Sequence, residues 1–258
     1  MSDEVSIQVE AGVLTVWFNR LDRKNAITTA MYATMADALA SADSDPSLRV
    51  AVLQGHDSIF TAGNDLADFQ KGAPGDDSPV FRFVHSIARF SKPLLAAVCG
   101  PAVGVGTTML FHCDMVYAGE NAAFSMPFVN LGLCPEAASS LLAPQTFGYH
   151  RAAEALLLGE QMSAQAAFDV GLVNKILPVS EVNAYAQAQA RKLTAKPMSS
   201  LLEIKRLMKK GQHAAVSQQM TDESSSFRRM LVQPAAMEAF AAFIEKRKPD
   251  FSKVSATD

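Results

Sequence analysis

The sequence predicts an α/β protein, because short apolar runs alternate with helical patterns over its first two thirds and nearly continuous helix follows. The apolar runs have the length of strands, and most end at glycine or asparagine. They lie at residues 13–18, 50–53, 94–98, 115–118 and 173–177. Alternation of strand and helix in this order indicates a sheet covered by helices.

Two helices are predicted between these strands. The first has apolar residues at every fourth position from Met31 to Leu39 and follows Thr28, whose hydroxyl suits a helix start. The second has an apolar face that runs from Phe81 to Ile87. Both helices can therefore pack one side against the strands.

The chain becomes mostly helical after Tyr149. Helical patterns occupy residues 152–158, 164–168, 182–193, 197–209 and 216–230, and a last helix begins at Pro234. In the last helix Met237, Phe240 and Ile244 form an apolar stripe, which favours contact with another surface. We therefore expect a core at residues 1–195 and a helical C-terminal region at residues 196–258.

Composition narrows the class of protein. The 258 residues are 49% hydrophobic, enough for a substantial core, and the net charge of −3 argues against nucleic acid as a partner. No window approaches the ~18 apolar residues of a membrane span. The three cysteines, Cys99, Cys113 and Cys134, are an odd number without metal-like spacing. We expect a cytoplasmic protein without a metal site.

Two glycine turns follow apolar runs, at residues 60–66 and 99–106. In the first, Gly63 can free the backbone to present the N–H of Asn64; in the second, Gly104 precedes Val105 at a helix start. Two such N–H groups could form an oxyanion hole, which stabilises charge on a carbonyl oxygen. Two ordinary turns would show the same pattern.

Glu136 places one carboxylate in an apolar neighbourhood, between Leu133 and Ala137. Because it follows Pro135, we expect it in the first turn of a helix, where the helix dipole favours a negative charge. Alternatively, partial burial would raise its pKa toward a value suited to moving a proton from carbon.

Other polar residues have structural explanations. His112 lies between apolar neighbours and is expected to be buried and hydrogen-bonded, Asp114 to orient the start of a strand, and Asp65 to cap a helix. The serines at 139 and 140 have no histidine at a readable spacing, so we predict no nucleophilic triad.

Six segments in order resemble the crotonase (enoyl-CoA hydratase/isomerase) superfamily, over residues 7–251. They lie at residues 19–26, 60–66, 100–104, 112–114, 123–132 and 243–251. The resemblance implies a spiral of repeated ββα units with a helical C-terminal trimerisation region. It also implies a homotrimer or a dimer of trimers, and a coenzyme A thioester as substrate with no separate cofactor.

The same resemblance assigns site residues by motif position. Asn64 and Val105 would donate the two oxyanion N–H groups. The residues expected to line the path of the substrate are Lys24, Ala26, Ala62, Asp65, Leu66, Phe128 and Leu133.

Two departures from the hydratase pattern change the expected reaction. Hydratases use two glutamates to activate water, and the matching positions hold Thr108 and Phe128. The segment around Glu136 is instead similar to the peroxisomal-type 3-enoyl-CoA to 2-enoyl-CoA isomerases. We therefore expect Glu136 to shuttle one proton from C2 to C4. The alternatives are an enoyl-CoA hydratase, a dienoyl-CoA isomerase, and a catalytically silent acyl-CoA-binding or scaffold protein.

Overall fold

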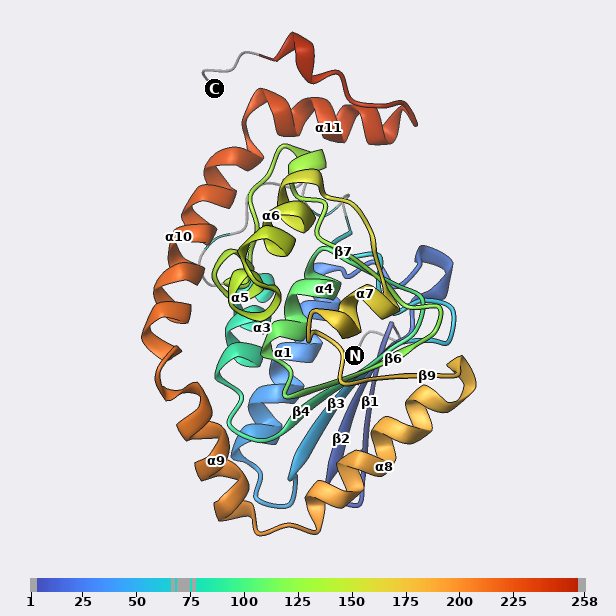
Figure 1. Ribbon diagram of the computed structural model, residues 1–258, viewed down its shortest axis with the longest axis vertical. Helices are drawn as coiled ribbons and strands as arrows, with labels where there is room; N and C mark the ends of the chain where they lie inside the picture. Colours follow the sequence, from blue (N-terminus) through green and yellow to red (C-terminus); the bar gives the residue numbers. More distant parts are fainter. Residues whose placement is uncertain (1–3, 66–67, 69–74, 76–77, 255–258) are drawn as a thin grey trace.

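A six-stranded sheet forms the centre of the computed structural model, which describes residues 4–65, 68, 75 and 78–254 (Figure 1). The strand order is β1-β2-β3-β4-β6-β9, with β1 antiparallel to β2 and the other neighbours parallel. The strands are β1 (Val5–Glu10), β2 (Val13–Phe18), β3 (Val50–Gln54), β4 (Leu94–Val98), β6 (Met115–Gly119) and β9 (Lys175–Leu177). The predicted α/β class is thus confirmed, and all five predicted strands are present.

Helices cover both faces of this sheet. Helix α8 (Val182–Thr194) packs on one face, and α1 (Thr29–Ser44) and α3 (Pro79–Arg89) lie on the other side in Figure 1. Strand β3 shows why: Val50 and Val52 face the cluster under α8, whereas Ala51 and Leu53 face the main core. Successive strand residues point to opposite faces, so a strand buried on both faces is apolar throughout.

A second, three-stranded sheet was not predicted. It consists of β5 (Pro101–Val103), β7 (Ala123–Ser125) and β8 (Met162–Ser163), in the order β5-β7-β8. Strands of two or three residues are too short to show an alternating pattern. This small sheet holds the second glycine turn, because β5 ends immediately before Gly104.

The remaining described helices include the short α4 (Val105–Thr108), whose four residues are all buried. The others are α5 (Ser139–Phe147), α6 (Tyr149–Leu158), α7 (Ala164–Asp169), α9 (Met198–Lys210), α10 (His213–Leu231) and α11 (Pro234–Ile244). Short 3-10 turns are η1 (Leu21–Arg23), η2 (Met109–His112), η3 (Val129–Leu131), η4 (Val179–Glu181) and η5 (Phe251–Lys253). Figure 1 shows α9, α10 and α11 running along one side and over one end of the molecule.

The apolar stripe predicted on α11 is only partly covered within the chain. Phe240 is buried, whereas Met237 and Ile244 are 58% and 61% exposed. Phe243, beside them, is 63% exposed. The helix therefore leaves apolar surface to solvent, and the trimer that the resemblance implies stays a prediction.

A buried ion pair ties the helical C-terminal region to the sheet. Lys205 of α9 lies 2.7 Å from Asp114, and both side chains are largely buried. Asp114 also accepts a hydrogen bond from the N–H of Leu94, the first residue of β4, at 2.8 Å. The prediction that Asp114 orients a strand start is confirmed.

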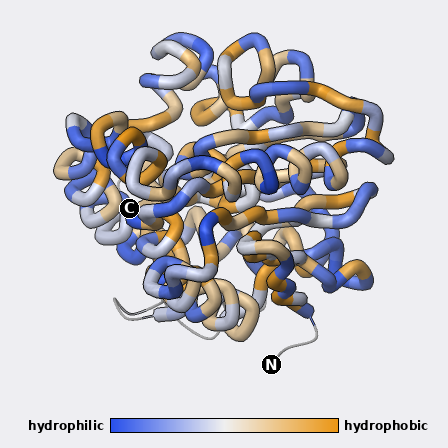
Figure 2. Tube along the Cα trace, turned by 90° about the horizontal axis from the view of Figure 1, so that it is seen from below, coloured by the Kyte–Doolittle hydropathy of each residue, from blue (hydrophilic) through white to orange (hydrophobic). Residues whose placement is uncertain are grey.

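No described helix is long and apolar enough to cross a bilayer. Hydrophobic and hydrophilic residues instead alternate along the trace in Figure 2.

Candidate active site

The two glycine turns lie side by side. Thr61 pairs with Ala102 in a parallel bridge, and the N–H of Val103 donates to the carbonyl of Thr61 at 3.0 Å. Gly63 has a φ of +87°, and a Cβ added there would lie 2.7 Å from the carbonyl oxygen of Val103. Only glycine allows both this backbone conformation and this close approach.

Each turn presents a backbone N–H group. Asn64 follows Gly63 in the first turn, and Val105 follows Gly104 as the first residue of α4. Neither N–H donates to another group in the part of the chain that the structure describes. An N–H at the start of a helix has no partner within the helix. The adjacent turns therefore offer two rigid N–H donors, and an anionic oxygen can accept a hydrogen bond from each.

Tyr32 holds the Asn64 side chain. Its hydroxyl donates to Oδ1 of Asn64 from the buried face of α1. Burial raises the pKa of Tyr32 well above its usual value, and the negative charge of Glu136 adds to the effect. Tyr32 is therefore a neutral donor that fixes the first turn. The sequence pattern marked this face of α1 as core and gave no sign of the contact.

Glu136 lies in the same cavity as Asn64. The cavity has a volume of about 30 Å³, and its apolar lining comes mainly from α3, at Val80 and Val84, and from Phe227 of α10. Burial raises the pKa of Glu136 to about 8; a hydrogen bond from Thr108 opposes this rise, and the charge of Glu223 adds to it. A carboxyl group with this pKa exchanges a proton readily near neutral pH.

The structure corrects the predicted position of Glu136. Helix α5 begins only at Ser139, because Ala137 and Ala138 adopt left-handed conformations with φ of +59° and +56°. Glu136 thus precedes the helix instead of occupying its first turn. The residue lies outside the first turn, where the helix dipole acts most strongly, and burial is the largest influence on its pKa.

Glu223 of α10 binds the start of α5 instead. Its carboxylate accepts hydrogen bonds from the N–H of Ala138 at 2.6 Å, the N–H of Ser140 at 2.9 Å, and the Ser140 hydroxyl. The sequence prediction missed Glu223. The sequence pattern could have indicated Glu223, because it lies between Met220 and Phe227 on the buried face of a helix. An acidic residue at such a position is almost always paired.

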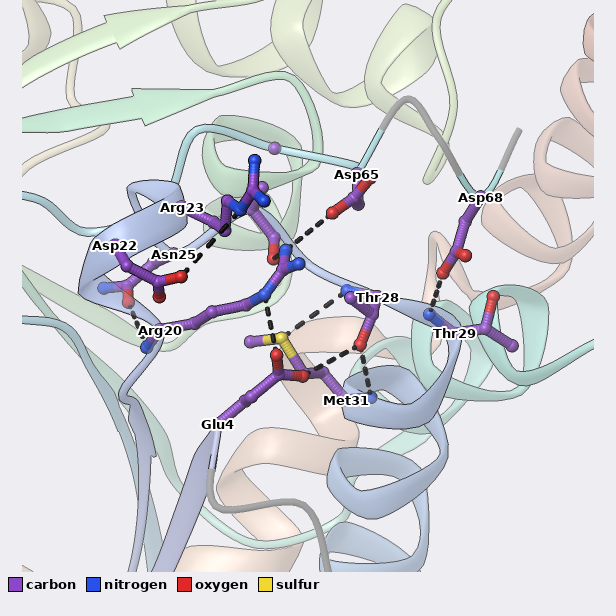
Figure 3. Close-up of polar contacts among 12 residues, drawn as sticks. Glu4, Arg20, Asp22, Arg23, Asn25, Thr28, Thr29, Met31, Asp65 and Asp68 are labelled. Atoms are coloured by element: carbon purple, nitrogen blue, oxygen red, sulfur yellow. Dashed lines mark hydrogen bonds and ion pairs between the residues drawn. The ribbon is translucent and has the colours of Figure 1, made fainter. Parts of the chain in front are cut away.

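Four of the residues expected along the substrate path come together on the other side of the first turn. The N–H of Ala62 donates to the carbonyl of Lys24 at 3.0 Å. Arg20 donates to the carbonyl of Ala26 at 2.9 Å and pairs with Asp65 at 2.6 Å (Figure 3). Asp65 is therefore held by an ion pair. The helix that it was expected to cap falls mostly on residues outside those that the structure describes. Leu66 lies outside the described residues.

Phe128 and Leu133 are placed differently from the expectation. Both are buried in the main core, and the described lining of the Glu136 cavity does not include them. The N–H of Leu133 donates to the carbonyl of Phe128 at 2.9 Å, which closes the η3 turn between them. Any contact of these two side chains with substrate stays a prediction.

Two other groups near Glu136 are unsuited to catalysis. His112 is buried, as predicted, with Nε2 2.7 Å from the carbonyl oxygen of Ala137, and burial lowers its pKa to about 4. Burial also raises the pKa of the Cys134 thiol to about 11, so that it is not a thiolate at neutral pH. His85 and Glu223 also line the Glu136 cavity, and the Glu223 carboxylate binds the start of α5. Glu136 is therefore the carboxyl group of this cavity that the start of α5 leaves unengaged.

The chain matches known proteins over nearly its full length. The family model described as enoyl-CoA hydratase/isomerase matches residues 8–254. Enoyl-CoA delta isomerase 2 of Rattus norvegicus is 32% identical over 255 residues, which cover 96% of this chain and 65% of the rat protein, so the chain spans less than two thirds of that relative. The 2,3-dehydroadipyl-CoA hydratase of Escherichia coli is 31% identical over 96% of this chain and 98% of its own length.

A solved structure shows the same fold. OdaA of Pseudomonas aeruginosa superposes with a TM-score of 0.92 at 44% sequence identity, covering 94% of this chain and 99% of OdaA. Together with the family match, this confirms the crotonase fold that the sequence predicted. The chain belongs to the enoyl-CoA hydratase/isomerase family.

Proposed function

We propose that the protein is an isomerase that converts a 3-enoyl-CoA to the 2-enoyl-CoA with Glu136 as the single base. The observation that carries this proposal is the placement of Glu136, with a pKa of about 8, in one cavity with Asn64. The rat relative, which is named as a delta isomerase, agrees with it.

The geometry suggests how the chain performs the reaction. The thioester carbonyl accepts hydrogen bonds from the N–H groups of Asn64 and Val105. Ionised Glu136 then removes a proton from C2, and the negative charge that spreads to the carbonyl oxygen is stabilised by the two donors. The protonated Glu136 returns the proton to C4, which leaves the double bond conjugated with the thioester.

The surroundings of Glu136 favour one base over two. Glu223 lines the same cavity, but its carboxylate already accepts three hydrogen bonds from the start of α5. The two positions where hydratases carry glutamates hold Thr108 and Phe128. A second acid that could activate water is therefore not available in the described part of the cavity.

The proposal also covers the binding of the coenzyme A part of the substrate and the oligomeric state. Residues 20–26 and 62–65, which are joined by hydrogen bonds and an ion pair, would line the coenzyme A path beside the first turn. The exposed apolar residues of α11 would be covered in a homotrimer or a dimer of trimers.

Two parallel assays test the reaction class. A 3-enoyl-CoA should gain the absorbance of a conjugated thioester when the protein is added. A 2-enoyl-CoA in water should keep that absorbance, because water is not added to it. Faster loss of absorbance from the 2-enoyl-CoA than gain from the 3-enoyl-CoA would make the protein a hydratase, the class to which the name of the E. coli relative assigns that protein.

A further inference from the structure

Three cavities lie in line between α3 and α10. The Glu136 cavity shares His85 and Met220 with a second cavity of about 50 Å³. The second cavity shares Arg89, Lys209 and His213 with an outer groove of about 590 Å³. Cavities that share lining residues are neighbours, so movement of the shared side chains would join the three into one path from Glu136 to the surface.

The path changes from apolar to basic along its length. Its inner end is lined by Val80, Val84 and Phe227. The outer groove has six basic side chains and no acidic one among its described lining residues. These six are Arg89, Lys205, Arg206, Lys209, Lys210 and His213.

Some of these basic groups already have partners. Lys205 pairs with Asp114, Arg206 pairs with Glu203, and Lys209 donates to the carbonyl of His112 at 3.1 Å. Arg89 and His213, which stand where the second cavity meets the groove, form no hydrogen bond or ion pair with any described residue. Two exposed side chains that can donate hydrogen bonds are thus left at the outer end of the path.

The positive charges of the outer groove also affect the pKa values of neighbouring side chains. Burial, and then the charge of Arg89, lower the pKa of His85. Burial, and then the charge of Lys205, lower the pKa of Lys209. A negative charge placed among these groups would relieve this repulsion.

We infer that the acyl group of the substrate ends in a carboxylate, which Arg89 and His213 bind at the outer end of the path. This inference rests on the proposed function and names its substrate class. Arginine can hold a carboxylate with two parallel hydrogen bonds. An acyl chain that ended in a methyl group would instead displace water from these exposed donors without replacing its hydrogen bonds.

The path also sets the length of the acyl chain. Val80 and Arg89 are nine residues apart on α3, which corresponds to roughly 14 Å along a helix. The chain must reach over about this distance to bring its far end to Arg89. Met220 lines the two narrow inner cavities, and its unbranched side chain can move aside for the passing chain.

The test uses pairs of 3-enoyl-CoA esters that have the same length and end in either a methyl group or a carboxylate. The full-length protein is compared with the double variant Arg89→Met, His213→Gln. Lys192→Met, at an exposed position of α8 that is not among the described lining residues of the groove, serves as the control. Thermal unfolding shows whether each variant remains folded.

In the wild type we expect kcat/KM to be higher for the carboxylate ester by roughly tenfold or more, as charge-assisted hydrogen bonds provide. The double variant should lose this preference and keep its rate on the methyl ester, and Lys192→Met should keep both. Equal kcat/KM for the two esters in the wild type would overturn the inference. So would an equal loss on both esters in the double variant, which would assign the groove to the coenzyme A phosphates.

Failure of the proposed function gives a different result. If the wild type converts neither ester, calorimetric binding of the two esters still tests the inference. Tighter binding of the carboxylate ester, lost in the double variant, would support it, and equal binding would overturn it.

Discussion

The hydroxyl of Thr108 donates a hydrogen bond to Oε1 of Glu136. Thr108 is the last residue of α4, and Val105 is the first. One short helix therefore carries the N–H of Val105 at one end and the hydroxyl that binds Glu136 at the other. This arrangement couples the position of Glu136 to that of the Val105 N–H.

The pKa of Glu136 predicts the pH dependence of the enzyme. Because the base must be ionised, kcat/KM should rise with pH and level off above about pH 8. Thr108→Val removes the hydrogen bond that stabilises the ionised form, so the rise should move to higher pH. At neutral pH the variant should lose several-fold, up to about tenfold, in kcat/KM. A pH–rate profile measures this, and an unchanged profile would contradict the role of Thr108.

Glu223→Gln should move the same profile in the opposite direction. The charge of Glu223 raises the pKa of Glu136, so its removal makes Glu136 easier to ionise. The glutamine oxygen can still accept one N–H at the start of α5. A shift to lower pH would separate the electrostatic effect from simple loss of structure, which lowers the rate without moving the profile.

The two turn glycines give a matched pair of variants. Gly63→Ala would place a Cβ 2.7 Å from the carbonyl oxygen of Val103, whereas a Cβ at Gly104 would meet nothing within 4 Å. Both substitutions carry the strain of a positive φ, on the order of 1–3 kcal/mol, and at Gly104 a ψ of −119° lies outside the left-handed helical region that alanine can adopt. Only Gly63→Ala should also displace the Asn64 N–H, with a loss of roughly 10²-fold or more in kcat. Comparable kcat for the two folded variants would refute this distinction.

The raised pKa of Glu136 also has a cost in stability. Because the folded protein holds this proton more tightly than the unfolded chain, its contribution to stability is greatest below about pH 4.5 and declines as pH rises toward 8. Glu136→Gln should therefore stabilise the protein by about 1–3 kcal/mol at high pH and by little at low pH. Denaturant unfolding at about pH 5 and pH 9 measures the difference. An equal effect at both pH values would mean that Glu136 is not buried as described.

The features that the sequence predicted well are those with a local signal. Strands β2 and β4 begin and end where their apolar runs do, because both are buried on two faces. Thr28 caps α1 as its hydroxyl suggested. The glycine turns were visible because left-handed backbone and close approach both favour glycine.

The missed features depend on contacts that no local pattern shows. Ala137 and Ala138 adopt left-handed conformations that alanine rarely takes, and Glu223, far along the chain, binds the backbone there. The contact between Thr108 and Glu136 likewise forms only when α4 and the loop before α5 come together. Such pairings are set by the tertiary structure.

The most direct test of the account compares wild type with Glu136→Gln in the conversion of a 3-enoyl-CoA to its 2-enoyl isomer, with binding of a CoA ester measured on both. The substitution keeps the shape of the side chain and its hydrogen bond from Thr108, but it removes the base. Turnover should fall by roughly 10²–10⁴-fold while the dissociation constant of the ester changes little. Turnover close to wild type in the variant would show that another group moves the proton and that Glu136 is not the base.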